Sequence, residues 1–171
     1  MTSDVSEAAS TTVANVILRP VESTDEPFLL ELYAATRTEE MALVPWSEAQ
    51  KKSFIEQQFN AQQEHYKKSY PDASHDVIIC DRRNVGRIYV ARLPTAIRIV
   101  DITIAAAERN RGIGTGLIRR LMQESERTSK PLTIYVETFN PSARLFQRLG
   151  FLPGEEQSIH VLMEWSSRSK D

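Results

Sequence analysis

A glycine-rich segment constrains the fold of this chain more than any other feature: Arg109-Asn110-Arg111-Gly112-Ile113-Gly114-Thr115-Gly116. It follows the long apolar run Ile97–Ile104, which is typical of a central strand, and precedes apolar residues at helical spacing. Glycines at a strand-to-helix turn let the backbone bend tightly and approach a ligand without a Cβ in the way. The unpaired N–H groups and the dipole of the following helix favour an anion there, and Arg109 and Arg111 add positive charge. The segment therefore predicts a site for a phosphate group.

The spacing of this segment excludes two common phosphate loops. A Walker A loop requires G-x-x-x-x-G-K-[ST], but no lysine occurs between Lys68 and Lys130. A dinucleotide fingerprint requires a third glycine where Leu117 stands, and it should open a domain near its start. A plainer alternative is that the glycines only ease strand-to-helix packing, but three glycines beside two arginines favour an anion site.

Composition excludes several other classes of protein. The 21 basic and 23 acidic residues give a net charge of −2, which argues against nucleic acid as the main partner. One cysteine and three scattered histidines provide no metal-ligand spacing, so no metal is expected. No stretch approaches the ~20 apolar residues of a membrane span, and the first residues show no secretory pattern, so we expect no membrane association and a cytoplasmic location.

Hydrophobic periodicity predicts one mixed domain over residues 16–165, with a flexible leader over 1–15 and a polar tail over 166–171. Ser47 with Gln50 predicts a capping box at the start of a helix that Pro71 ends. Helices come first, then a meander of strands, then alternating strands and helices, which indicates an α+β fold with helices on the faces of a mixed sheet. The predicted strands are 16–21, 77–80, 85–91, 97–104, 132–136 and 158–165, and the predicted helices begin at Ser23, Ser47, Gly112 and Asn140.

Two motifs in this arrangement resemble those of one known family. Arg109-x-x-Gly112-x-Gly114, after a strand ending at Ile104, resembles the R/Q-x-x-G-x-G/A signature of the GNAT superfamily of acyl-CoA N-acyltransferases. The segment from Asn140 to Phe151 resembles the N-x-x-A-x-x-L-Y-x-x-L-G-F segment of the same family. The resemblance implies a mostly antiparallel mixed sheet of about six to seven strands, splayed between the fourth and fifth strands, with helices on both faces.

The resemblance also implies acetyl-CoA as co-substrate. The loop amides would bind the pyrophosphate, the end of the fourth strand would pair with the pantetheine arm as a substitute strand, and Asn140 would meet that arm. Asn140 would also cap its short helix with or without a ligand. The implied cofactor-binding residues are Ile102, Ile104, Arg109, Asn110, Arg111, Gly112, Ile113, Gly114, Thr115, Asn140, Ala143 and Phe146.

The reaction that the resemblance implies is direct transfer of an acyl group from the thioester to an amine of a small molecule or peptide. The sequence departs from the family at two positions, because Arg98 aligns with a common glutamate base and Phe146 with a common tyrosine acid. We expect Asp101 or Glu137 to deprotonate the acceptor, directly or through a water molecule. Asp101 has an ordinary alternative role, in an ion pair with Arg98 or Arg92.

The acceptor pocket is expected around Tyr33, Arg37 and Trp46 of the early helices, together with Tyr135 of the fifth strand. One alternative remains open at this level, an acyl-CoA-binding module without catalysis. A dinucleotide-binding oxidoreductase would be revived only if NAD and not coenzyme A raised the melting temperature. Edge strands such as the last one could pair with another subunit, so a homodimer is also left open.

Overall fold

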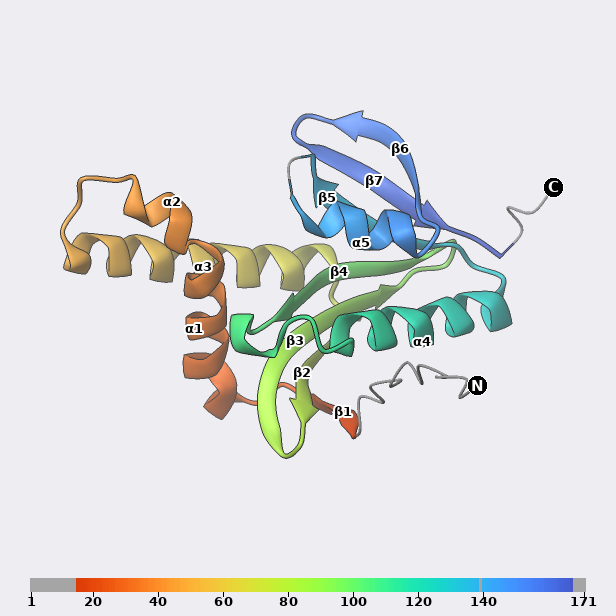
Figure 1. The fold of residues 1–171 in the computed structure, drawn as a ribbon, viewed down its shortest axis with the longest axis horizontal. Helices are drawn as coiled ribbons and strands as arrows, with labels where there is room; N and C mark the ends of the chain where they lie inside the picture. Colours follow the sequence, from red (N-terminus) through yellow and green to blue (C-terminus); the bar gives the residue numbers. More distant parts are fainter. Residues whose placement is uncertain (1–14, 139, 168–171) are drawn as a thin grey trace, which may run out of the picture.

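The computed structural model describes residues 15–138 and 140–167 of the chain. This part of the chain forms one seven-stranded sheet in the order β1-β2-β3-β4-β5-β7-β6 (Figure 1), in which only β4 and β5 run parallel. The mixed, mostly antiparallel sheet that the sequence predicts is therefore confirmed. The strands are β1 (Val16–Pro20), β2 (Ser74–Cys80), β3 (Arg83–Arg92), β4 (Ile97–Ile104), β5 (Leu132–Glu137), β6 (Leu152–Gln157) and β7 (His160–Trp165).

Helices cover both faces of the sheet. One face packs against α4 and α5 and holds the main apolar cluster, whereas α1 and α3 lie on the opposite face. The helices are α1 (Glu26–Thr36), α2 (Thr38–Ala42), α3 (Glu48–Ser69), α4 (Ile113–Thr128) and α5 (Ser142–Arg148), with 3-10 turns at Ser23–Asp25 and Ala106–Glu108.

The main core follows from strand alternation and helical spacing. Ile97 and Ile99 of β4 point to the α4 face, where Leu117 and Ile118 of α4 are also buried. Because successive strand residues alternate between faces, Arg98 points to the α3 face. Burial of these large aliphatic side chains contributes roughly 1.5–3 kcal/mol each, which fixes α4 on the sheet.

The predicted capping box at Ser47 is confirmed. The Ser47 hydroxyl accepts a hydrogen bond from the Gln50 amide at 3.2 Å, and the Gln50 side chain accepts one from the Ser47 amide at 2.9 Å. Downstream in the helix, Ile55 and Phe59 pack with Leu29 of α1 in a second apolar cluster. The cap thus sets where α3 begins, and this cluster sets how α1 and α3 pair.

Strands β4 and β5 diverge after a short paired stretch. Their parallel pairing covers only Ile97–Ile99 of β4 and Leu132–Ile134 of β5. On its other side β4 continues to pair with β3 as far as Ile104, with a register shift that leaves Val100 as an extra residue. Because a bulge bends a strand, it directs the second half of β4 away from β5. The predicted splay between the fourth and fifth strands is confirmed.

A glycine in β3 permits the close approach of β3 to the open half of β4. A Cβ on Gly86 would lie 2.3 Å from the Thr103 carbonyl oxygen and 3.2 Å from the Ile104 Cα. Both atoms belong to the backbone, so neither could move aside without shifting a strand. Gly86 therefore fixes the spacing of β3 and β4 where β4 has lost its other neighbour.

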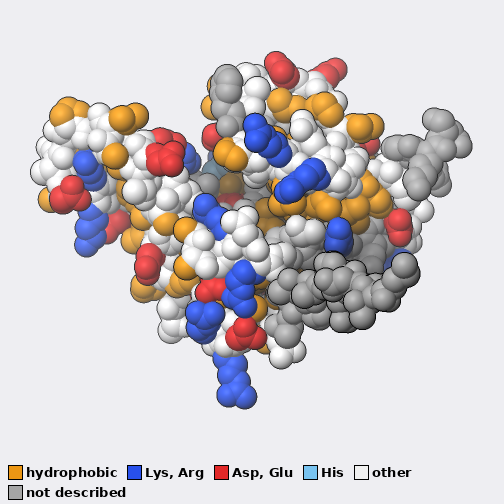
Figure 2. All heavy atoms as spheres, viewed as in Figure 1, with side chains coloured by type: hydrophobic (Ala, Val, Ile, Leu, Met, Phe, Trp, Pro, Cys, Tyr) orange, Lys and Arg blue, Asp and Glu red, His pale blue; other side chains and the backbone are white. Residues whose placement is uncertain are grey.

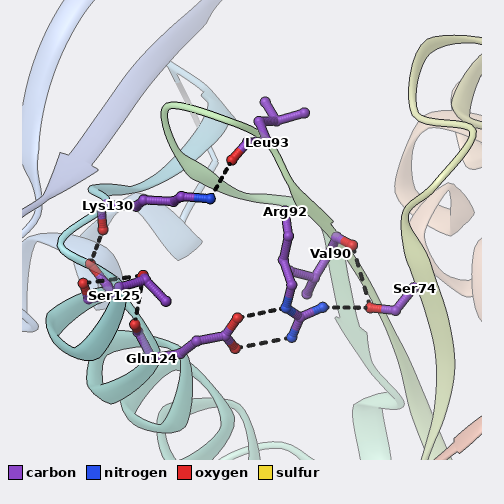
Figure 3. Close-up of polar contacts among 8 residues, drawn as sticks. Ser74, Val90, Arg92, Leu93, Glu124, Ser125 and Lys130 are labelled. Atoms are coloured by element: carbon purple, nitrogen blue, oxygen red, sulfur yellow. Dashed lines mark hydrogen bonds and ion pairs between the residues drawn. The ribbon is translucent and has the colours of Figure 1, made fainter.

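The closed end of the splay is held by polar contacts between the β3–β4 turn and the C-terminal end of α4 (Figure 3). Arg92 donates two hydrogen bonds to the Glu124 carboxylate at 2.6 and 3.0 Å. The Lys130 ammonium donates to the Leu93 carbonyl at 3.0 Å, and the Ser125 hydroxyl donates to the Lys130 carbonyl. These bonds tie the start of β5 to β4, so the two strands open only at their far ends.

Some elements differ from the sequence prediction. The strand β6 was not predicted, because Pro153, Gly154 and two glutamates give it no apolar alternation; it is an edge strand that pairs only with β7. The short helix α2 was also missed. The β2–β3 turn is tighter than the expected 81–84, since Asp81 and Arg82 alone take positive φ angles of 51° and 65°. Residues 1–14 of the predicted leader and 168–171 of the predicted tail lie outside the described residues.

Candidate active site

The glycine-rich segment forms the turn from β4 into α4. Gly112, with φ of 78°, precedes the helix in the left-handed region and offers no side-chain cap. The first intrahelical bond runs from the Gly116 amide to the Gly112 carbonyl at 2.9 Å. The amides of Ile113, Gly114 and Thr115 consequently have no acceptor among the described residues, and they provide three donors at the positive end of the helix dipole.

The charges beside this turn are partly balanced. Arg111 forms ion pairs with Glu108 and, at 3.4 Å, with Asp81. Arg109 is exposed, and its Nε donates to the Ile104 carbonyl at 3.1 Å. The Arg109 side chain is thus anchored at the end of β4 while its terminal nitrogens lack an acceptor among the described residues.

The open ends of β4 and β5 border a hollow in the surface. Figure 2 shows this hollow between the part formed by α5, β6 and β7 and the part formed by the start of α4, with basic side chains on both rims. Figure 1 places the divergence of β4 and β5 in the same region. The backbone of residues 101–104 has no strand partner on the β5 side, so its polar groups there, apart from the Ile104 carbonyl that Arg109 engages, are available to a ligand.

Asp101 lies in a buried polar cluster on the α3 face of β4. It accepts hydrogen bonds from Arg87 at 2.5 Å and from the Thr103 hydroxyl at 2.9 Å. The Arg87 side chain is only 3% exposed, and Gln62 and Gln63 of α3 also accept from it, at 2.7 and 3.0 Å. The cluster therefore links α3, β3 and β4 through one buried guanidinium.

The partner of Asp101 differs from the sequence expectation of Arg98 or Arg92. The pairing of β3 with β4 sets Arg87 opposite Thr103 on the same face as Asp101, whereas Arg92 lies at the other end of β3 and pairs with Glu124. The shared face of Asp101 and Thr103 is confirmed by the hydrogen bond between them. Only the strand register could reveal Arg87, because it lies 14 residues away in the sequence.

Aromatic rings and a histidine surround this cluster. The His75 ring stacks on Tyr89 at 4.4 Å, and Tyr66 of α3 meets Tyr89 edge-on at 5.3 Å. Burial, reinforced by the charge of Arg87, lowers the pKa of His75 to about 4, and its Nε2 atom has no hydrogen-bond partner among the described residues. Burial, with the nearby charge of Asp101, raises the pKa of Tyr66. His75 is therefore neutral at physiological pH.

The β5 side of the same face carries Arg98, Tyr135 and Glu137. The Arg98 guanidinium lies over the Tyr135 ring, 4.9 Å from its centroid, and Nε donates to the Thr133 hydroxyl at 3.3 Å. Tyr135 is 37% exposed. Glu137 is exposed, lies opposite His160 of β7, and has no side-chain hydrogen bond or ion pair within the described residues.

Among the predicted acceptor residues of the early helices, Trp46 lies apart from Tyr135, and Tyr33 and Arg37 pack on each other. Tyr33 is only 8% exposed and packs against Phe59, with Arg37 over its ring at 5.3 Å. Trp46 packs against Phe54 at the start of α3. Figure 1 places the α2–α3 connection at the end of α3 remote from the divergence of β4 and β5.

The second motif is split between a helix cap and the core. The Asn140 side chain accepts from the Ser142 amide at 2.9 Å, which is the expected capping role. Ala143 packs against the main core, and Phe146 is 2% exposed and meets Phe151 edge-on at 5.2 Å. Phe146 thus serves α5 packing and shows almost no surface to solvent.

Sequence reasoning missed Arg87, Gln62, Gln63 and His75. The weak signal for Arg87 is a charged residue within the apolar strand Val85–Ala91, and the two glutamines carry no signal of their own. Within the described residues no group of acidic, histidine or cysteine side chains could hold a metal ion, and no helix is long and apolar enough to span a membrane.

The fold and the turn define an α+β protein whose sheet opens beside a helix start with three amides that have no acceptor among the described residues. A model of the "Acetyltransferase (GNAT) domain" family matches residues 15–152. Since this match covers most of the sequence, the chain belongs to the GNAT acetyltransferase family. No curated protein matches the chain in sequence.

Solved structures show the same fold at low sequence identity. The chain is similar to the PaiA N-acetyltransferase of Thermoplasma acidophilum in complex with coenzyme A, with a TM-score of 0.67, 14% identity, and 89% and 99% of the two chains covered. It is also similar to an acetyltransferase of Thermus thermophilus, with a TM-score of 0.64 and 18% identity over 90% of this chain and 98% of the other. A GNAT family acetyltransferase of Elizabethkingia anophelis with acetyl-CoA bound has a TM-score of 0.55 and 15% identity over 90% of this chain and 99% of the other.

Proposed function

We propose that this protein transfers an acetyl group from acetyl-CoA to an amine of a small molecule or peptide. The observation that carries the proposal is the divergence of β4 and β5. It leaves one backbone edge of β4 unpaired, next to the amides at the start of α4 that have no acceptor among the described residues. Family membership, and relatives solved with coenzyme A or acetyl-CoA bound, support it.

The residues present fit coenzyme A. A Cβ on Gly114 would lie 3.9 Å from Ile104, and one on Gly116 would meet nothing within 4 Å, so the turn leaves room next to its amides. We assign the pyrophosphate to the amides of residues 111–115, with Arg109 and Arg111 supplying charge. Since Glu108 and Asp81 already share the charge of Arg111, Arg109 contributes the larger uncompensated charge.

The backbone of Ile102 and the Ile104 amide would pair with the amides of the pantetheine arm, as an added strand pairs with a sheet edge, and the Ile104 carbonyl would join them once Arg109 turns to the pyrophosphate. Asn140 and Ala143 are proposed to border that arm from α5, whereas Phe146 would act by packing the helix that presents them. Bound acetyl-CoA supplies the thioester whose carbonyl carbon accepts the amine.

Deprotonation of the amine falls to Glu137 in our proposal. An alkylamine with a pKa near ~10.4 is almost fully protonated at pH 7, so a base is needed. Glu137 is exposed and unpaired within the described residues, whereas Asp101 is engaged by Arg87 and Thr103. Asp101 would then act mainly as the counter-ion of Arg87 and only secondarily, through water, as a base.

Thiol release from acetyl-CoA, measured against a panel of amines, tests the function. The Glu137→Gln variant should lose about 10²–10⁴-fold in kcat while its affinity for acetyl-CoA, measured by calorimetry, stays unchanged. Glu164 of β7 lies on the same face of the sheet as Glu137 of β5, so Glu164→Gln is the matched control and should keep full activity. Unchanged turnover of the Glu137→Gln variant would remove Glu137 from the mechanism.

A second candidate is an acyl-CoA-binding module without catalysis. Two features favour it: Phe146 is buried and has no proton to donate, and Arg98, at the position that the resemblance aligns with a glutamate base, cannot act as a base. Micromolar acetyl-CoA binding with no turnover of any amine would establish this alternative.

A further inference from the structure

Arg98 differs from the other arginines that are not fully exposed. Among the described residues, Arg19, Arg37 and Arg87 are at least partly buried, and each has a carboxylate partner. Arg98 is also partly buried, but no carboxylate of the described residues lies within ion-pair distance. Removing a charge from water without a counter-charge is costly, so such a guanidinium is expected to have an anionic partner when the protein works.

The neighbours of Arg98 are neutral, and they hold the guanidinium in place. Its Nε donates to the Thr133 hydroxyl at 3.3 Å and its Nη1 to the Tyr70 hydroxyl at 3.5 Å, while the ring of Tyr135 lies beneath it. A guanidinium has five N–H donors in a planar fork, so donors remain for a further acceptor. The contacts orient Arg98 without neutralising it.

Arg98 lies at the point where β4 and β5 part. The last paired residues are Ile99 and Ile134, and Arg98 shares the α3 face with Tyr135 and Glu137. Residues two apart on a strand are separated by about 6.6 Å, so Glu137 follows one such step beyond Tyr135. A cationic fork and a proposed base are thus neighbours on one surface.

We infer that Arg98 binds a carboxylate of the acceptor, so that the acceptor is an amine that also carries a carboxylate, such as an amino acid or a peptide end. This inference rests on the proposed acetyl transfer and names its substrate class. A planar guanidinium takes a carboxylate bidentately. With the carboxylate on Arg98, the amine of the same molecule faces Glu137, whereas the double charge of a phosphate dianion would be repelled by Glu137 more strongly than a carboxylate.

Matched acceptor pairs test the inference. Thiol release from acetyl-CoA is measured with the free L-amino acids and dipeptides, and with the carboxamide of each. For the best acceptor, the wild type should prefer the acid over its amide by roughly 10²-fold or more in kcat/KM, because a site built for a charged group is left unpaired by the neutral analogue. Amines bearing a phosphate, such as phosphoethanolamine, form a third arm.

Variants of Arg98 separate recognition from structure. Arg98→Gln should raise KM for the acid and bring the acid-to-amide ratio of kcat/KM close to one. Arg98→Lys should restore part of the preference, since it keeps the charge but not the fork. Arg119→Gln, an exposed arginine of α4, is the control and should keep the wild-type ratio. If Arg98 has only a structural role, Arg98→Gln will lower kcat/KM equally for the acid and the amide. The acid-to-amide ratio would then stay unchanged, which would overturn the inference.

The wild-type protein alone also decides the question. Preference for amines without an anionic group, or for phosphate-bearing amines, refutes the carboxylate site and leaves acetyl transfer standing. If no amine is acetylated, calorimetry of the free amino acids against coenzyme A-loaded protein still tests the site, and no binding refutes it. Absence of acetyl-CoA binding would instead refute the proposed function.

Discussion

The buried pair of Arg87 and Asp101 yields the sharpest prediction about stability. Asp101→Asn keeps the shape of the side chain and one oxygen acceptor but removes its charge. Arg87, with a side chain only 3% exposed, would keep Gln62 and Gln63 as neutral acceptors at 2.7 and 3.0 Å. Its positive charge would have no counter-ion at that depth.

Removing one member of a buried ion pair typically costs about 3–5 kcal/mol, because the remaining charge stays desolvated. The two glutamines lessen the loss, so we expect about 3 kcal/mol, at the lower end of that range. For a chain of this length each kcal/mol lowers Tm by roughly 2–4 °C, which gives a decrease of about 10 °C. Loss of both charges in Arg87→Met/Asp101→Leu should recover at least half of that free energy, since apolar replacement of a buried pair is often neutral.

Urea unfolding followed by circular dichroism measures these free energies. Glu124→Gln is the control, because it breaks the Arg92 ion pair, whose arginine is 48% exposed, and should cost less than about 1 kcal/mol. Two results would show that Arg87 does not depend on the charge of Asp101. Asp101→Asn would lower the free energy of unfolding no more than Glu124→Gln does, or the double variant would lose as much free energy as Arg87→Met and Asp101→Leu lose together when made singly.

The remaining predictions concern glycines and a histidine. Gly86→Ala should destabilise the protein by roughly 1–3 kcal/mol, because its Cβ would lie 2.3 Å from the Thr103 carbonyl oxygen. Gly116→Ala, in open space within a helix, should stabilise it by roughly 0.5–1 kcal/mol, and thermal unfolding compares the two variants. Gly112→Ala, at φ of 78°, should cost roughly 1–2 kcal/mol and weaken acetyl-CoA binding in calorimetry; unchanged affinity would separate the turn from the cofactor. Burial lowers the pKa of His75 to about 4, so as the pH falls the unfolded chain takes up a proton at this residue before the folded protein does. The stability that the neutral His75 ring contributes is therefore complete above the unfolded pKa near ~6.5 and is lost as the pH falls to about 4. The loss should be roughly 1–2 kcal/mol after allowance for the exposed part of the ring, and His75→Gln should flatten the pH dependence of urea unfolding between about pH 4 and 7.

Local patterns were enough to predict much of the fold. The run Ile97–Ile104, the Ser47–Gln50 capping box and the Asn140 cap each depend on residues a few positions apart, and the structure confirms all three. The glycine turn also fell where predicted, since glycine and helix-start signals are local. Family membership followed from motifs within these same segments.

The partners of the site residues were beyond sequence reasoning. Asp101 stood out as a carboxylate in an apolar strand, but its ion pair with Arg87 depends on the β3–β4 register. Phe146 matched a cofactor motif, yet helix packing places it in the core. Residue chemistry predicts that Trp46 and Tyr135 share a pocket, whereas the 22-residue helix α3 holds the connection that carries Trp46 away from β5.

Most helices and strands, the glycine turn and the family could be predicted from the chain's residues alone, because these features depend on the spacing of neighbouring residues. Only the packing of the chain shows where β4 leaves β5, which carboxylate neutralises Arg87, and that Arg98 has no ion-pair partner in the part of the chain that the structure describes. The physical reason is that charge pairing and strand divergence are set by contacts between distant segments. Hydrophobic periodicity specifies which face of a strand is buried, but not which side chain lies opposite.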